Sequence, residues 1–184
     1  MKAKRDTTRS GRLTIREAGK PEQKRFNKLL VEKHPQQKPK QVGHELRMIV
    51  EEDGEWVGVL IWTSACQRLQ DRDEWIGWTN AQRAQRLKLV VQLRRFLVVE
   101  AVRRPNLASR CMGLALRQLA GQWREAHGYE PLLAESFSDP ESHAGTVYKV
   151  TNWQPLGMSA GYSRQRADFY TKHDQPKRLW IYEL

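Results

Sequence analysis

One stretch of the sequence constrains the fold more than any other, because it combines two apolar strands with a long helix between them. The first strand is predicted over residues 96–102 (FLVVEAV) and the second over 132–137 (LLAESF). Between them, a helix is predicted to start after Pro105 and to end before Gly128. Two strands joined through a crossover helix pair in parallel. The chain therefore needs a sheet with a parallel pair and a helix packed on one of its faces.

The flanking sequence adds further strands and helices to this unit. A strand is predicted over 13–16, an amphipathic helix over 22–33, and a hairpin of strands 46–50 and 56–62 that turns at Gly54. Residues 34–43 and 63–78 are predicted to be irregular. A helix capped by Thr79 or Asn80 is expected to reach position 91, a short helix is expected over 139–151, a glycine-containing strand and turn follow over 152–161, and a last strand covers 179–182.

These elements predict an α/β fold: a mixed, mostly parallel-cored sheet with helices on both faces. The chain has 184 residues, enough for one domain that folds without disulfides or metal. We expect a single domain over 13–184, preceded by a flexible basic arm over 1–12.

Positive charge is concentrated at the start of the chain. Residues 1–40 contain 13 Lys and Arg against 4 Asp and Glu, whereas residues 41–184 contain 19 against 17. Such a segment favours nucleic acid as a partner, since each neutralised phosphate releases counterions. The alternative is a solvated tail that only keeps the protein soluble. The candidate phosphate contacts here are Lys2, Lys4, Arg5, Arg9, Arg12 and Arg16.

Several classes of protein are excluded by simple patterns. The longest apolar run, 56–62, is far shorter than the roughly 18 residues of a membrane span. Cys66 and Cys111 are isolated, and the five His residues show no zinc-binding spacing, so no metal site is predicted. We expect a cytoplasmic protein with no membrane partner.

A second candidate nucleic-acid contact combines indole and guanidinium groups. Trp75 and Trp78 lie near Arg72 and Arg83, in the segment predicted to be irregular. Aromatic faces interleaved with arginines suit the stacking of unpaired bases. Alternatively, both indoles fold back into the core.

The start of the long helix is a candidate anion site. Arg103, Arg104, Asn106 and Ser109 surround it, and a helix N-terminus with unpaired amides attracts anions. The alternative is that Asn106 only caps the helix and that the arginines are solvated.

Two glutamates interrupt the apolar strands of the central unit. Glu100 and Glu135 are either general bases with a raised pKa or buried partners of Arg94 or Arg95. Glu135 is the stronger catalytic candidate. A metal cluster of Glu135 with Asp139 and His143 is disfavoured, since Asp139-Pro140 is an ordinary helix start.

Three long motifs resemble the DruA domain, a family named after the Druantia anti-phage system and also found in transposase-like proteins of mobile elements. They are DRDEWIGWTNAQR (71–83), RRFLVVEAVRRPNLASRCMGLALRQLAGQW (94–123) and LLAESFSDPESHAGTVYKVTNWQPLGMSAG (132–161), within a similarity that covers 25–184. The resemblance implies a nucleic-acid-associated protein of a defence system or mobile element, with DNA as a partner and other defence or transposition proteins as further partners.

The order of elements is also similar to that of GNAT acyltransferases. This resemblance implies that Tyr148 takes the place of their general acid, whereas the alternative for Tyr148 is packing under the sheet. In that family a glycine-rich turn before the central helix holds the pyrophosphate of acyl-CoA. Here the turn is RRPNLAS (103–109), without glycine, so acetyl-CoA is disfavoured as a cofactor. A GNAT-like acyltransferase and a scaffold that docks a partner on the broad apolar helix remain the alternative functions.

Overall fold

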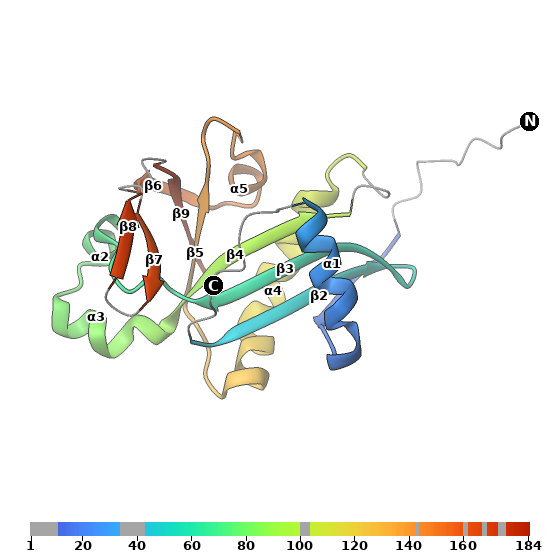
Figure 1. Cartoon of the computed structure of the whole chain (residues 1–184), viewed down its shortest axis with the longest axis horizontal. Helices are drawn as coiled ribbons and strands as arrows, with labels where there is room; N and C mark the ends of the chain where they lie inside the picture. The colour runs from blue at the N-terminus through green and yellow to red at the C-terminus, as the bar shows by residue number, and fades with distance from the viewer. Residues whose placement is uncertain are drawn as a thin grey trace, which may run out of the picture.

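The computed structural model describes residues 11–33, 43–99, 104–142, 144–159, 162–166, 169–172 and 176–184. They form a seven-stranded sheet in the order β1-β2-β3-β4-β5-β9-β6 and a separate pair β7-β8 (Figure 1). The strands are β1 Leu13–Glu17, β2 Glu45–Glu52, β3 Glu55–Ser64, β4 Val90–Val98, β5 Leu133–Ser138, β6 Gln154–Met158, β7 Tyr162–Arg166, β8 Phe169–Lys172 and β9 Arg178–Glu183. The α-helices are α1 Gln23–Lys33, α2 Gln70–Ile76, α3 Asn80–Arg86, α4 Leu107–His127 and α5 Thr146–Val150, with single 3₁₀ turns at Lys20–Glu22 and Leu87–Leu89.

The sheet is mixed, as predicted, but it is not mostly parallel. Among the described strands, only β4 and β5 pair in parallel. Strands β1 to β4 form an antiparallel meander, and β9 returns antiparallel between β5 and β6. The prediction of a parallel-cored sheet was wrong because it extended the geometry of one crossover unit to strands that the chain connects without such a crossover.

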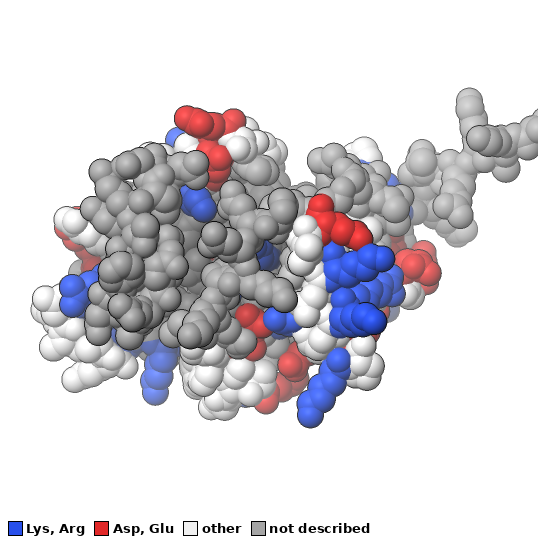
Figure 2. Space-filling view, viewed as in Figure 1, with Lys and Arg blue, Asp and Glu red and all other residues white. Residues whose placement is uncertain are grey.

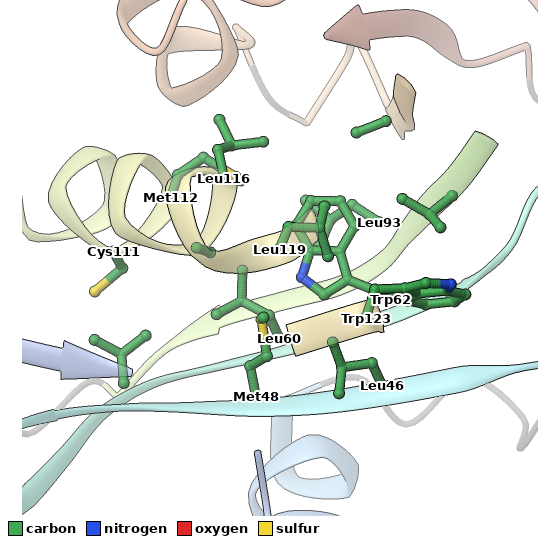
Figure 3. Packing of buried hydrophobic residues seen from close by; sticks show 14 of the residues in the cluster. Leu46, Met48, Leu60, Trp62, Leu93, Cys111, Met112, Leu116, Leu119 and Trp123 are labelled. Atoms are coloured by element: carbon green, nitrogen blue, oxygen red, sulfur yellow. The ribbon is translucent and has the colours of Figure 1, made fainter. Parts of the chain in front are cut away.

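Helices cover both faces of the sheet, as predicted. On one face, Phe26 of α1 is fully buried against Ile49, Trp56 and Val59. On the other face, α4 packs its apolar side against β2, β3 and β4, where Trp62 and Trp123 are fully buried (Figure 3). The broad apolar arc of α4, which suggested a docking surface, is thus occupied by the sheet of the same chain.

Four local predictions differ from the structure. The helix predicted over 139–151 is confined to α5, Thr146–Val150. The segment 63–78 contains the helix α2, which ends at Gly77 in the left-handed region (φ 77°). The helix expected to reach position 91 ends at Arg86, and β4 already begins at Val90 rather than Phe96. Val90 and Val91 are both buried, since they pair with β5 on one side while Val91 also pairs with β3. Tertiary pairing therefore overrides the helical spacing of the apolar residues there.

The parallel strands separate soon after they pair. Their ladder runs from Val90 and Leu133 to Leu93 and Ser136, and β4 then continues to Val98 without a described partner on that side. Figure 1 shows the two strands diverging from this point. We call the place beyond Leu93 where the backbones of β4 and β5 diverge the fork.

Candidate functional site

Two hydroxyl groups meet where the fork begins. The Ser136 hydroxyl donates to the carbonyl oxygen of Leu93 (3.2 Å), the residue with which it makes the last parallel pair. The Tyr148 hydroxyl, from α5, lies 2.9 Å from the Ser136 Oγ atom. The fold thus brings a phenol and an alcohol together at the base of the fork.

Aromatic packing fixes the Tyr148 ring in this position. It stacks on Trp180 with 5.0 Å between ring centroids and meets Trp153 edge-on. Burial raises the pKa of the Tyr148 phenol, and the hydrogen bond with Ser136 acts in the opposite direction. The ring therefore packs against the core, as one alternative for Tyr148 states, and a general-acid role for its hydroxyl stays a prediction.

Glu135 is fully buried and paired, but with an arginine that the sequence did not indicate. The Arg72 Nη1 atom donates to the Glu135 Oε2 atom (2.8 Å), and the backbone amide of Cys66 donates to Oε1 (2.8 Å). The predicted partners, Arg94 and Arg95, are not its ion-pair partners. Burial raises the pKa of the Glu135 carboxyl, and Arg72 and the Cys66 amide lower it.

The same arginine links the sheet to the two short helices. Arg72 is 0 % exposed and donates to Asp73 as well as to Glu135, and Arg83 of α3 pairs with the other oxygen of Asp73 (3.2 Å). The prediction that Arg72 contacts nucleic acid is therefore corrected, since its guanidinium is enclosed by carboxylates inside the domain. Arg83 is half-buried and stands at the end of this series of ion pairs, which runs from Glu135 through Arg72 and Asp73.

The two tryptophans of this region are not both in the core. Trp75 is 40 % exposed at the end of α2, whereas Trp78 is half-buried. An exposed indole on a helix anchored by Arg72 fits the stacking alternative for Trp75. A nucleic-acid contact at Trp75 stays a prediction.

The predicted anion site at the start of α4 is partly neutralised. Arg104 pairs with Glu52, a carboxylate that is itself 4 % exposed, and Arg110 lies 3.7 Å from the same group. Asn106 precedes the helix in the left-handed region (φ 60°) and makes no side-chain cap, while the Ser109 hydroxyl donates to its carbonyl. Arg103 and Glu100 lie outside the described residues.

The described part of the basic N-terminal segment forms an exposed edge of the domain. Arg12 is exposed, whereas Arg16 is held by Glu22 and Glu51. Basic side chains continue along the first helix, and Figure 2 shows a cluster of Lys and Arg over α1. We call Lys20, Lys24, Arg25 and Lys28, all exposed, the α1 basic face. Lys2, Lys4, Arg5 and Arg9 lie outside the described residues, and the boundary of the arm at residue 12 stays a prediction.

Sequence reasoning did not find Ser136. The available signal was a hydroxyl residue next to Glu135 in an otherwise apolar strand. Within the described ranges no group of three His, Cys, Asp or Glu side chains could hold a metal ion, and no helix is long and apolar enough to cross a membrane. His143 lies outside those ranges.

Comparison with solved structures shows that the chain has the fold of acetyltransferases. Aminoglycoside acetyltransferase AAC(6')-Ib, in complex with coenzyme A, matches with a TM-score of 0.60 at 12% sequence identity, over 94% of this chain and 95% of that one. The IAA acetyltransferase from Bacillus cereus ATCC 14579 matches with a TM-score of 0.59 at 12% identity, over 94% and 100%. An acetyl transferase from Salmonella typhimurium that modifies the N-terminal serine of 50S ribosomal subunit protein L7/L12 gives 0.57 at 9% identity, over 95% and 96%.

The sequence comparison gives the family. No curated protein matches the sequence. The model of one family, described as Druantia protein DruA, matches residues 5–179, nearly the whole chain. The fold of this chain matches that of GNAT acetyltransferases, and it consists of the crossover unit, the antiparallel strands β1 to β4 and the fork described above. The chain therefore belongs to the DruA family.

Proposed function

We propose that this protein is a nucleic-acid-binding component of an anti-phage defence system or mobile element, with DNA as its partner. The observation that carries the proposal is the concentration of positive charge in residues 1–40, where 13 Lys and Arg face 4 acids. Family membership supports the defence role. Contacts to phosphates would give affinity without strong sequence preference.

The α1 basic face offers much of the described part of this charge on a rigid support. Phe26 anchors the helix in the core, and the Arg25 guanidinium lies over the Trp56 ring, 4.1 Å from its centroid. Lys24 and Lys28 project from the exposed side of the same helix. Cations fixed on one face can follow a phosphate backbone, which scattered charges cannot do equally well.

The test measures how salt weakens the binding of a labelled DNA duplex and of a single strand, using fluorescence polarisation. If about six phosphates are contacted, log K should fall with log salt at a slope near −5. The double variant Lys24→Gln/Lys28→Gln should bind more weakly and reduce the slope for the duplex by about 2.

The control removes the same charge from the opposite face of the sheet. Arg117 of α4 and Lys149 of α5 are both exposed there. The variant Arg117→Gln/Lys149→Gln should bind as the unaltered protein does. Salt-independent binding, or equal losses in both variants, would contradict the proposal.

The second candidate function is acyl transfer, favoured by the hydroxyl pair at the base of the fork. Tyr148 and Ser136 meet there, in a fold shared with acetyltransferases solved with coenzyme A. As a general acid, the Tyr148 phenol would donate its proton to the leaving thiolate of an acyl-CoA. The turn before α4 argues against this candidate, because Pro105 has no amide to donate and Arg104 is paired with Glu52.

Acetyl-CoA binding and a single hydroxyl deletion test this candidate. A donor that binds the native state raises the melting temperature in a concentration-dependent way. Tyr148→Phe keeps the ring stacked on Trp180 and should lower any acyl-transfer rate by about 10²–10⁴-fold. Tyr182→Phe, which removes a hydroxyl from β9, is the matched control. No thermal shift with acetyl-CoA would remove this candidate.

A further inference from the structure

Two arginines and an isoleucine form a row across three neighbouring strands. Arg47 of β2 pairs with Ile61 of β3, and Ile61 pairs with Arg95 of β4. Directly paired residues point to the same face of a sheet. Ile61 packs in the cluster beneath α1, as does Leu97 two residues after Arg95. The Arg47 and Arg95 side chains therefore share the α1 face of the sheet.

An irregularity in the strand pairing adds a third guanidinium to this row. The register of β3 and β4 shifts between Ile61 and Trp62: Ile61 lies opposite Arg95 and Trp62 lies opposite Leu93, and Arg94 falls at the shift between them. Its Nη1 atom lies 3.9 Å from the Glu45 Oε2 atom, and the Arg47 Nε atom lies 2.6 Å from Oε1. Two of the three arginines thus share one carboxylate. We call Arg47, Arg94 and Arg95 the arginine row.

Arg95 differs from its neighbours because no carboxylate of the described residues pairs with it. Its Nη1 atom donates to the carbonyl oxygen of Arg94 (3.0 Å), and its side chain is half-buried. Burying a charge without a counter-charge costs free energy unless a ligand supplies one. Burial lowers the pKa of Arg95, and burial together with Arg95 lowers that of Arg94.

Part of the arginine row is open to solvent. Arg47 and Glu45 line a surface hollow of about 320 Å³, together with Glu17, Ala18 and Gln23. Arg47 and Arg94 keep 25% and 18% of their side chains exposed. The guanidinium groups are thus held in place but not sealed from solvent.

We propose that the arginine row binds a phosphate-type oxyanion on the α1 face of the sheet, with Arg95 as the residue that its charge neutralises. Planar guanidinium groups bind phosphate oxygens through paired hydrogen bonds. The phosphate comes either from a nucleic-acid backbone or from a free phosphate-bearing small molecule. This site goes beyond the α1 basic face and beyond the hydroxyl pair, and it depends on neither.

The experiment uses the full chain and two probes. Inorganic pyrophosphate is titrated by calorimetry at low salt, and a labelled ten-nucleotide single strand is titrated by fluorescence polarisation. Arg95→Gln should weaken at least one probe by about tenfold or more, the size expected when charge-assisted hydrogen bonds are lost. Arg86→Gln, which removes an exposed charge from α3, should stay within about twofold of the unaltered protein. Arg95→Lys keeps the charge but not the planar set of guanidinium donors, so its affinity should lie between those of Arg95→Gln and Arg86→Gln.

The two probes distinguish a nucleic-acid phosphate from a free phosphate ligand. They also distinguish binding by the arginine row from binding by the α1 basic face. If Arg95→Gln binds pyrophosphate more weakly, the site is assigned to small phosphate-bearing ligands. If Arg95→Gln loses affinity for the single strand alone, the site is assigned to nucleic acid. The double variant Lys24→Gln/Lys28→Gln should bind the labelled single strand more weakly and bind pyrophosphate with unchanged affinity. The inference fails if neither probe binds, or if Arg95→Gln equals Arg86→Gln. It also fails if Arg95→Gln lowers the melting temperature by several degrees, since a half-buried charge that no described carboxylate pairs should not stabilise the fold.

Discussion

At the scale of single residues, the pair of Arg72 and Glu135 shows how a buried charge is tolerated. Both side chains are 0% exposed, and each charge is satisfied by several hydrogen bonds. The sequence identified Glu135 as a buried charge that needs a partner. It could not identify Arg72, because 63 residues separate the two and α2 brings them together.

Removing one member of this pair should destabilise the domain more than removing both. Arg72→Ala should lower the free energy of unfolding by about 3–5 kcal/mol, because it leaves a buried carboxylate without its counter-charge. The double variant Arg72→Met/Glu135→Leu should recover most of that loss. Urea unfolding followed by tryptophan fluorescence measures both. Arg83→Gln, at the solvent end of the same series of ion pairs, should cost about 1 kcal/mol or less.

At the scale of elements, Arg16 holds β1 to the start of α1 and to β2. Its guanidinium donates to Glu22 at 2.6 Å and to Glu51 at 2.7 Å. Glu22 also accepts the amide of Gly19. The hydrogen bonds from Arg16 lower the pKa of Glu22 to about 2. The contact is therefore expected to weaken in acid.

The pH dependence of this contact has a definite sign. Because the pKa of Glu22 is lower in the folded state than in the unfolded state, its contribution is present above the unfolded pKa of about 4.3 and is lost as pH falls through about 2. The difference in melting temperature between the unaltered protein and Glu22→Gln should be present at pH 6 and shrink toward pH 2. A constant difference over that range would contradict the assignment.

Gly145 places α5 against the sheet and should not tolerate a side chain. It has φ 70°, and a Cβ atom there would overlap the Trp180 indole, against which Tyr148 stacks. Gly145→Ala should destabilise the protein by about 2–4 kcal/mol, combining backbone strain with overpacking. Gly128 is the control, since it has φ 82° with open space around it. Gly128→Ala should therefore cost only the backbone part, about 1–2 kcal/mol, in thermal unfolding.

At the scale of the whole molecule, the strand β9 lies inside the sheet, one position from its edge. β9 lies between β5 and β6, and Trp180 and Ile181 are fully buried. Deletion of residues 178–184 should abolish the cooperative unfolding transition, because it leaves β5 and β6 without their shared neighbour. A truncated chain that still unfolds cooperatively in circular dichroism would contradict this view of the sheet.

Local sequence patterns were sufficient to predict several of the elements. The hairpin around Gly54, the helix that ends before Gly128 and the apolar strand after it were all predicted, because turn residues and apolar periodicity act over a few positions. The concentration of charge in residues 1–40 is also a property of the sequence alone.

Contacts between distant residues followed from the tertiary structure. It made most of the sheet antiparallel, started β4 at Val90, paired Glu135 with Arg72 and placed Ser136 beside Tyr148. It also left Arg95 without a carboxylate partner among the described residues. Each of these outcomes depends on strand register and on burial, which bring together residues tens of positions apart. Local sequence patterns do not specify which strands pair, so the residues of the candidate sites could be identified only from the folded structure.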